Sequence, residues 1–500
     1  MSSAWFPPSP TLWESTSEMR FAPERIGTIV DWRGSERWSG TDIDRHAAAL
    51  CTRLRDLGAG PGKRVVLWHG GSGRFFADLF GIWQTGACAV CLNPSTTLEE
   101  LQRILDFVDA LAVIDVGPRR LGDELTATPI DSLMIDQTEA IGRPGTGNLD
   151  DDALILFTSG TTGTPKGVVH TFRSLLARIA LNQANIPAAE RARALNVLPT
   201  HFGHGLIGNC LTPLLDGQTV VLAPAANLDV ATRLGSLIDE HGITFMSSVP
   251  TLWKRILGTS AAPESGSLAR VHVGSAPLST TLWEGISAWA GTRNVVNMYG
   301  ITETANWIAG AALTDSGATD GAVGRMWGGA AAVRSDDGEI HAVGDGELVV
   351  QAPSLMKGYF RLPEQTADVL ADGWFRTGDI GHIDAAGSIR LTGRQKYEIN
   401  RGGLKVHPED IDLLLERHPT VGEACAFAIP DEIEGEAVGV AVTPVAGVEV
   451  DTRALRRWCA ERLAREKVPT RWFVVTEIPK TDRGKINRDV VAAHCLQETA

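Results

Sequence analysis

Apolar side chains recur first at helical spacing and then in short runs of strand length along the first 300 residues. A helix-like stretch followed by an apolar run appears at 98–107 before LAVIDV, at 230–241 before ITFMSS and at 282–290 before VVNMY, with a glycine between the two in the second and third cases. This alternation predicts parallel strands that are covered by helices. A further stripe fills 41–57 and ends at Gly58; its members are Ile43, Ala47, Leu50, Leu54 and Leu57.

The pattern changes twice in the second half of the chain. From Val323 onward it consists of short strands and turns, which predicts a mainly antiparallel β subdomain. After Lys396 it becomes mixed, with helices expected at 408–417 and 451–465. We therefore predict an α/β protein: a large N-terminal domain (1–395) of helix-covered β-sheets plus a β subdomain, followed by a small α+β C-terminal domain (396–500).

Composition and charge limit the kinds of partner. At 500 residues with 43% hydrophobic and 21% charged residues, the chain suits a globular enzyme of two or more domains. The formal net charge of −14 disfavours nucleic acid and anionic membranes as partners. An anionic substrate must therefore be held by local hydrogen-bond donors and a cation.

Seven cysteines at irregular spacing indicate reduced thiols and a cytoplasmic protein. Cys88 and Cys91 form a CxxC, but they stand in an apolar run without a second pair, so we expect buried small residues. The first thirty residues lack the basic start and apolar run of a signal peptide, and no stretch reaches about 20 uninterrupted apolar residues. We expect no membrane association.

The segment LFTSGTTGTPKGVVH (156–170) follows a strand-like run and holds hydroxyl side chains, glycines and Lys166. Glycines let backbone N–H groups approach phosphate oxygens, and the hydroxyls and ammonium add further donors. A Walker A motif is excluded because Pro165 stands where that motif needs glycine. Composition alone leaves a flexible surface linker as the alternative.

The order of residues in SGTTGTPKGV resembles the phosphate-loop signature of the adenylate-forming superfamily. That superfamily includes acyl-CoA synthetases, aryl-AMP ligases, adenylation domains of nonribosomal peptide synthetases and luciferases. The resemblance implies ATP and Mg²⁺ as cofactors. The phosphate-binding residues that it implies are Thr158, Ser159, Gly160, Thr161, Thr162, Gly163 and Lys166.

Three later segments resemble the nucleotide site of the same superfamily. In NMYGITET (297–304), the resemblance implies that Tyr299 stacks on adenine, Thr302 faces the phosphates and Glu303 helps to hold Mg²⁺. In WFRTGDIG, Asp379 would bind the ribose hydroxyls. The turn GSAP is similar to the family's GGAP turn. The remaining nucleotide-site residues implied by these matches are Gly274, Ser275, Ala276, Asn297 and Gly300.

Two segments near the C-terminus resemble the family's hinge and catalytic motifs. In GRQKYEINRGGLKVHP, Arg394 would contact ribose or phosphate, Lys396 marks the hinge, and Gly402 and Gly403 would line an acceptor tunnel after the C-terminal domain rotates. The NRGG tetrad is closest to the aryl-AMP ligases. The segment PKTDRGKINR supplies Lys485 at the catalytic lysine position, where an ammonium can bridge the attacking carboxylate and the α-phosphate.

The acyl pocket is expected around LPTHFGHGLIG (198–208), which corresponds to a family segment that often reads PLFH. His201 stands at the aromatic position, where it would either take a proton from an incoming amine or simply pack. His201 and His204 lack a third ligand for a metal. Phe202 and Trp307 favour a flat or bulky apolar acid, aromatic acids included. The predicted pocket residues are His201, Phe202, Ser248, Gly274, Ser275, Ala276, Thr304, Asn306 and Trp307.

These matches predict a ligase that uses ATP to convert a carboxylic acid to its acyl-AMP. The leading acceptor is a thiol, either coenzyme A or a carrier-protein pantetheine, and the alternative is an amine, which would give an amide directly. A non-catalytic nucleotide-binding regulator is a remote third reading, and the presence of Lys485, Glu303 and Asp379 argues against it.

Overall fold

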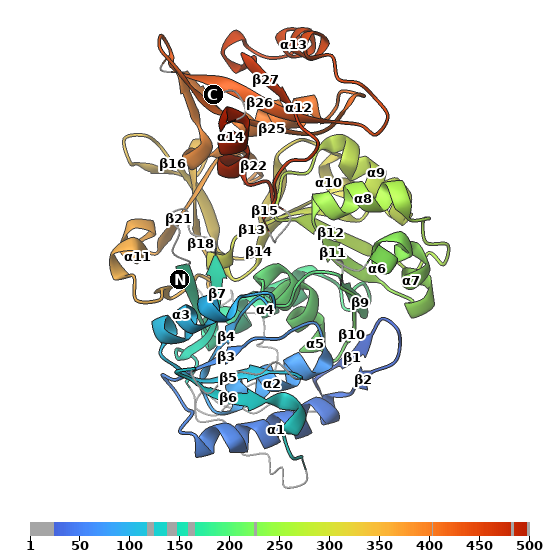
Figure 1. Ribbon diagram of the computed structural model, residues 1–500, viewed down its shortest axis with the longest axis vertical. Coiled ribbons are helices and arrows are strands. Elements are labelled where there is room, and N and C mark those ends of the chain that lie inside the picture. The colour runs from blue at the N-terminus through green and yellow to red at the C-terminus, as the bar shows by residue number, and fades with distance from the viewer. Residues whose placement is uncertain are drawn as a thin grey trace.

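The computed structural model describes residues 25–117, 125–137, 148–158, 166–224, 228–402, 404–481 and 485–497. Its described strands form three sheets, and a small C-terminal domain sits on a much larger N-terminal one (Figure 1). The predicted α/β class and two-domain organisation are confirmed. Within the described ranges, no helix is long and apolar enough to cross a membrane.

The first sheet has seven described strands in the order β19-β8-β7-β4-β3-β5-β6. Strands β7, β4, β3, β5 and β6 pair in parallel, as the sequence pattern predicts, whereas β8 and β19 run antiparallel at one edge. The strands are β3 (Arg64–Leu67), β4 (Cys88–Cys91), β5 (Ala110–Asp115), β6 (Thr128–Asp131), β7 (Asp152–Thr158), β8 (Lys166–Thr171) and β19 (Gly358–Tyr359).

The second sheet has fifteen described strands and changes character along its length. Its parallel part joins β1, β10, β9, β11, β12 and β13, and its antiparallel part contains the predicted β subdomain from β15 to β22. The strands are β1 (Thr28–Asp31), β2 (Arg37–Trp38), β9 (Arg193–Asn196), β10 (Thr219–Leu222), β11 (Phe245–Ser248), β12 (Arg270–Gly274), β13 (Val295–Gly300), β14 (Trp307–Ala312), β15 (Ala322–Met326), β16 (Ala330–Arg334), β17 (Ile340–His341), β18 (Gly344–Gln351), β20 (Leu370–Ala371), β21 (Trp374–Ile383) and β22 (Ile389–Arg394).

Helices fill the space between these two sheets and cover their outer faces. One apolar core joins α1, α2, α4 and the π-helix η3 to both sheets, α3 packs on the opposite face of the first sheet, and α6 to α9 cover the second. The helices are α1 (Gly40–Asp56), α2 (Gly73–Gln84), α3 (Leu98–Val108), α4 (Phe172–Asn185), η3 (His204–Leu211), α5 (Thr212–Leu214), α6 (Leu228–Thr232), α7 (Leu234–His241), α8 (Pro250–Thr259), α9 (Thr280–Ala290), α10 (Leu313–Ser316) and α11 (Pro363–Val369).

Local sequence explains where several helices begin. Helix α3 starts with a capping box in which Thr97 and Glu100 bond each other's backbone N–H, and Ser39 and Asp42 do the same for α1. The single helix predicted at 230–241 is wrong, because the chain breaks into α6 and α7. After the break, Gly235 lies so close to the backbone that a Cβ there would stand 2.2 Å from the carbonyl oxygen of Ala261.

The C-terminal domain contains the third sheet, drawn in orange and red at the top of Figure 1. The last strand of the second sheet ends at Arg394, and the first strand of the third begins at Ile399. The helix predicted at 451–465 ends earlier, at Ala460. The elements are β23 (Ile399–Arg401), β24 (Leu404–Val406), β25 (Val421–Asp431), β26 (Gly435–Pro444), β27 (Arg471–Val474), α12 (Pro408–Leu415), α13 (Thr452–Ala460) and α14 (Arg488–Gln497).

All seven cysteines are buried thiols that form no disulfide. Cys88 and Cys91 lie in the middle of the first sheet, where burial raises the pKa of both thiols. Among the described residues, no cluster of three or more His, Cys, Asp or Glu side chains could hold a metal. The expectation that the CxxC is a pair of packed small residues agrees with this environment.

Candidate active site

A cavity of about 530 Å³ opens where the carboxyl ends of parallel strands from both large sheets meet. Open α/β sheets bind ligands at this edge, because the loops that follow the strands converge there. The second sheet contributes the ends of β9, β10 and β13 and the loops after β11 and β12. The first sheet contributes Gly70 and Gly71 after β3, Pro94 after β4 and Leu156 of β7.

The cavity gathers many of the residues that the sequence singles out. Lys485 is the one Lys or Arg, and no Asp or Glu occurs, among the described residues that line it. Ser248, Gly274, Ala276 and Thr304 are described but lie outside this lining, so their predicted place in the pocket stays a prediction. The predicted residues in the lining are His201, Phe202, Ser275, Gly300, Thr302, Asn306, Trp307 and Lys485.

The side chains expected at the ribose and adenine meet around one buried carboxylate. Asp379 Oδ2 accepts a hydrogen bond of 2.6 Å from the hydroxyl of Tyr299, and its Oδ1 accepts one of 2.6 Å from Nε of Arg394. Burial and the neighbouring carboxylate raise the pKa of Tyr299, while the same carboxylate raises that of Arg394. Asp379 therefore lies between a neutral phenol and a guanidinium, and its two oxygens are suited to accept hydrogen bonds from a diol.

We expect Asp379→Asn to raise the KM for ATP by tenfold or more while leaving the melting temperature within a few degrees. The amide keeps the shape of the carboxylate but loses a charge-assisted acceptor, an interaction of about 1.5–3 kcal/mol. Initial rates of acid-dependent pyrophosphate release at varied ATP would measure the effect. Asp384→Asn, in the exposed turn after the same strand, is the matched control. An unchanged KM for ATP would remove Asp379 from the nucleotide site.

Tyr359 connects the expected metal ligand with the phosphate-loop lysine. Its hydroxyl donates to Oε1 of Glu303 at 2.8 Å, and Nζ of Lys166 lies 5.0 Å from the centre of its ring. Among the described residues, the second oxygen of Glu303 takes no hydrogen bond, so the carboxylate keeps a free face for a cation. No motif in the sequence analysis assigns a role to Tyr359.

Two buried basic side chains fix the loop that carries Thr302 and Trp307. His170, at the end of β8, bonds the carbonyl oxygen of Thr302 at 2.8 Å, and burial lowers the pKa of His170 to about 4, so the ring is neutral. Arg178 of α4 donates to the carbonyl of Trp307 at 2.5 Å and to the hydroxyl of Ser354 at 3.0 and 3.1 Å. Burial lowers the pKa of Arg178 to about 9. Neither residue was predicted as part of the site.

At the end of the cavity where the acyl pocket is expected, His204 is held by two hydrogen bonds. The sequence analysis considered this histidine only as a metal ligand and rejected that role. His204 begins the π-helix η3, a rare form that is common at functional sites. Its Nδ1 lies 2.8 Å from the hydroxyl of Ser275, and its Nε2 lies 2.6 Å from that of Ser247. His201 also lines the cavity, with its ring centre 4.1 Å from that of Phe202. The sequence signal for His204 is the GHG tripeptide within LPTHFGHGLIG (198–208).

The remaining predicted residues are either described but outside the cavity lining, or outside the described residues. Asn297 donates to the carbonyl of Ala322 and so ties β13 to β15, whereas Thr304 bonds backbone carbonyls within its own turn. Gly402 has a φ of +58° and lies outside the cavity lining in this domain orientation. Thr158 ends β7 beside Lys166. Predicted residues outside the described ones are Ser159, Gly160, Thr161, Thr162, Gly163 and Gly403.

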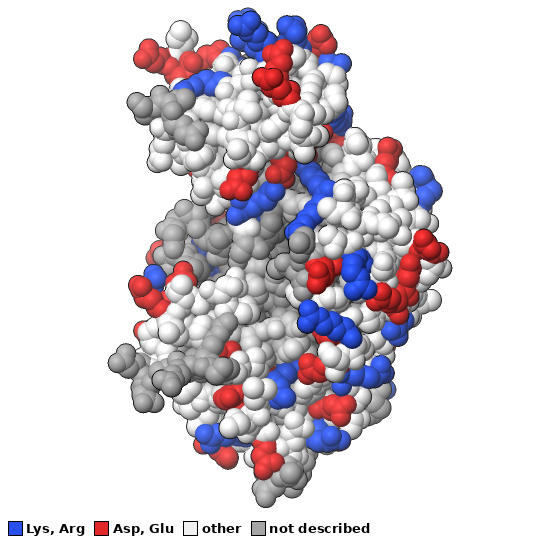
Figure 2. Space-filling view, turned by 45° about the vertical axis from the view of Figure 1, so that its right-hand side comes forward, with Lys and Arg blue, Asp and Glu red and all other residues white. Residues whose placement is uncertain are grey.

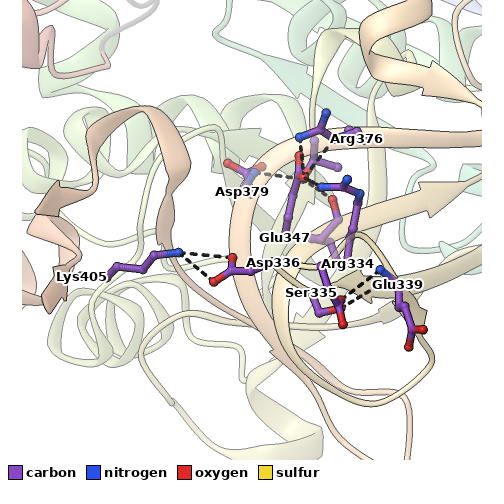
Figure 3. Close-up of polar contacts among 11 residues, drawn as sticks. Arg334, Ser335, Asp336, Glu339, Glu347, Arg376, Asp379 and Lys405 are labelled. Carbon is purple, nitrogen blue, oxygen red and sulfur yellow. Dashed lines mark hydrogen bonds and ion pairs between the residues drawn. The ribbon is translucent and has the colours of Figure 1, made fainter. Parts of the chain in front are cut away.

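Among the described residues, three ion pairs cross between the C-terminal domain and the rest of the protein while Lys485 is in the cavity. Lys254 of α8 lies 2.7 Å from Glu416, and Asp320 pairs with Arg417. Lys405 reaches Asp336 in the turn after β16 at 3.3 Å (Figure 3). In the view of Figure 2, a hollow separates the C-terminal domain above from the larger part below.

Comparison with known proteins agrees with this geometry. A family model described as "AMP-binding enzyme" matches residues 20–360, and one described as "AMP-binding enzyme C-terminal domain" matches residues 410–485. The oxalate–CoA ligase of Arabidopsis thaliana is 32% identical, with 91% of this chain and 92% of that protein covered. A feruloyl-CoA synthase of Amycolatopsis sp. is 31% identical, with 89% and 91% covered.

A solved structure adds a relative of different chemistry. The amide bond synthetase McbA from Marinactinospora thermotolerans superposes with a TM-score of 0.83 at 26% identity, and the match covers 94% of this chain and 98% of that one. The matches therefore extend over both domains. The chain belongs to the AMP-binding enzyme family and is an ATP-dependent, AMP-forming ligase that activates a carboxylic acid as its acyl-adenylate.

Proposed function

We propose that the chain adenylates a bulky, flat carboxylic acid in the cavity and transfers the acyl group to a thiol, with coenzyme A as the leading candidate. The observation that carries the proposal is Lys485 of the C-terminal domain, the one Lys or Arg among the described residues that line the cavity, a set that contains no Asp or Glu. A cation in such a place attracts a carboxylate and an α-phosphate to the same point.

In the first step, a carboxylate oxygen attacks the α-phosphorus of ATP, the bond to the bridging oxygen breaks, and pyrophosphate leaves. Lys485 offsets the negative charge that builds up between the reacting groups. Asp379 and Tyr299 hold the ribose and adenine, and Lys166 meets the leaving phosphates. Glu303 would hold Mg²⁺, which would neutralise phosphate charge when bound.

The wall of the cavity supports a bulky acid. Phe202 and Trp307 lie in the lining together with the aliphatic side chains of Val249, Leu252 and Met298. An uncharged and largely apolar wall binds a large hydrophobic body well, whereas a small dianion would leave most of the space unfilled. The feruloyl-CoA synthase shows by its name that a relative uses an aromatic acid. We propose aromatic acids as the first group to screen.

The acceptor is proposed to be a thiol because both curated relatives described above are named for coenzyme A chemistry. In this proposal, residues 396–500 rotate about Lys396 after the first step, Lys485 leaves the cavity, and Gly402 and Gly403 come to line the path of the thiol. The sulfur then attacks the acyl carbon, and AMP leaves with the electron pair of the broken anhydride bond.

A second candidate acceptor is an amine. His201 lies in the cavity wall against Phe202, where an imidazole could take the proton that an attacking amine loses. The likeness to an amide bond synthetase supports this alternative. In it, the same acyl-AMP gives an amide without passing through a thioester.

One incubation series separates the two acceptors. Purified protein with ATP, Mg²⁺ and a panel of aromatic and aliphatic acids would receive coenzyme A, a primary amine, both or neither, and products would be measured by mass spectrometry. We expect acyl-AMP without acceptor and acyl-CoA with coenzyme A. An amide formed without coenzyme A would establish the alternative, and absence of pyrophosphate release with every acid would overturn the proposed function.

A further inference from the structure

Ser275 lines the cavity, and its hydroxyl belongs to a chain of two hydrogen bonds that runs through His204 to Ser247. His204 bridges two serines, with Nδ1 2.8 Å from Ser275 Oγ and Nε2 2.6 Å from Ser247 Oγ. Ser247 is fully buried at the end of β11, whereas Ser275 is partly exposed in the cavity lining after β12. The bridge therefore has one sealed end and one end that a ligand can reach.

The bridging ring is neutral at any pH at which the protein would work. Burial lowers the pKa of His204 to about 3, and the charge of Lys485 acts in the same direction. A neutral imidazole has one N–H and one lone pair, so it donates to one serine and accepts from the other. If Ser275 receives the hydrogen bond, its O–H is left for a ligand. If Ser275 donates to the ring, its lone pairs are left instead.

Exchange of the two tautomers lets Ser275 act as a donor or as an acceptor, because Ser247 takes the opposite role at the sealed end. This hydrogen-bonded chain would gain nothing from a purely hydrocarbon ligand, because such a ligand has no hydrogen-bond donor or acceptor. The backbone of Ser275 is also in an unfavourable conformation, since its φ is +70°. A non-glycine residue in this region is strained by roughly 1 kcal/mol or more, and glycine would fit without that strain.

Two further hydrogen-bond donor groups belong to residues of the same wall. Nδ2 of Asn306 and Nε1 of Trp307 are buried, and within the described part of the chain neither has an acceptor at hydrogen-bond distance. Both residues line the cavity, and Gly208 makes room for them, since a Cβ there would lie 2.2 Å from that amide nitrogen. A buried donor without an acceptor costs about 1–3 kcal/mol, and neither nitrogen is exposed to the cavity as the wall stands.

We propose that Ser275, positioned by His204, recognises a hydrogen-bonding group on the acid, so that the substrate class is a flat, bulky acid bearing a hydroxyl, carbonyl or ring nitrogen. This inference rests on the proposed function, because it concerns the acid that the cavity adenylates. Ser275 is the specificity-determining residue, and His204 is a positioning residue that acts through it.

The test uses matched pairs of acids that differ by one polar group. Benzoate, naphthoate and cinnamate would each be compared with their hydroxylated and aza counterparts by initial rates of pyrophosphate release. For the wild-type protein we expect kcat/KM to be at least tenfold higher for the best polar member of a pair. Ser275→Gly removes the hydroxyl but suits the backbone, and His204→Phe keeps a ring of similar size against Trp307. Both should bring the ratio close to one.

The control is Ser265→Gly, an exposed serine in the loop before β12, which should keep the wild-type ratio. Use of plain and polar acids at equal efficiency by the wild type would overturn the inference, as would a preference that survives in both variants. Loss of folding in His204→Phe leaves Ser275→Gly to decide. Pyrophosphate release with plain acids but no polar preference refutes only the inference, whereas no release with any acid refutes the proposed function itself.

Discussion

Lys485→Ala is expected to lower acid-dependent pyrophosphate release by a hundredfold or more. The cavity loses its one Lys or Arg side chain among the described lining residues, just where the reacting carboxylate and phosphate gather negative charge. Removal of one preorganised charge contact in a transition state costs on the order of 10²–10³ in rate. Steady-state release of pyrophosphate at saturating ATP and acid would measure the loss.

Lys480→Ala is the matched control, because this lysine belongs to the same segment but pairs with Glu423 outside the cavity. It should keep most of the activity. Since Lys485 would leave the site before acyl transfer, Lys485→Ala should consume chemically prepared acyl-AMP and acceptor at close to the wild-type rate. A rate of adenylation within threefold of wild type would assign the catalytic cation to another residue.

Arg488→Met is expected to cost the C-terminal domain about 3–5 kcal/mol of stability, because it leaves buried carboxylates without their cation. Arg488 begins α14, three residues after Lys485, and bonds Asp412 at 2.8 Å and the carbonyl of Ala426 at 2.5 Å. Glu409 lies 3.4 Å away on the same side. The arginine therefore joins the terminal helix to α12 and β25.

The deficit should depend on pH in a defined direction. Burial raises the pKa of Asp412 to about 7, while Arg488 acts to lower it. Loss of the guanidinium raises that pKa further, so the folded variant holds a proton that the unfolded chain, with an ordinary carboxyl, releases near pH 4. The wild-type carboxyl also keeps its proton up to about pH 7, so the two proteins lose stability in parallel below that pH. The deficit of the variant should therefore stay constant from about pH 5 to 7 and grow only above about pH 7, so that it is larger at pH 8 than at pH 5.

Hydrogen exchange of peptides from β25 and β26 in the full chain would report the opening free energy of the C-terminal domain at both pH values. Arg453→Met, an exposed arginine on α13, serves as the control and should change little. Equal exchange in wild type and Arg488→Met would show that the buried carboxylates find other compensation.

The elements that the sequence predicted well carry their own local signals. Helix α3 has an apolar stripe and a capping box within the twelve residues from Thr97 to Val108, so no distant contact is needed to define it. The pairing of strands is harder to predict, because an apolar run of four residues does not indicate which other strand it will pair with. The parallel pairing of β4 with β7 and the break between α6 and α7 depend on contacts made across the fold.

The residues of the candidate site likewise include some that the sequence predicts and some that it does not. Tyr299, Asp379 and Arg394 were predicted together from separate motifs, and the structure brings them into one hydrogen-bonded group. His204 was missed because its partners, Ser247 and Ser275, come from the ends of two strands that sequence spacing does not bring together. Its chemistry is visible only when β11 and β12 lie side by side.

The ion pairs that join the two domains affect how the enzyme can cycle. Lys254–Glu416, Arg417–Asp320 and Lys405–Asp336 are all partly in contact with water. Pairs of this kind contribute about 0–1 kcal/mol each and weaken as salt is added. In the domain rotation proposed above, contacts of this strength would separate and re-form within each turnover, so the energy of substrate binding would suffice to decide which face the small domain presents.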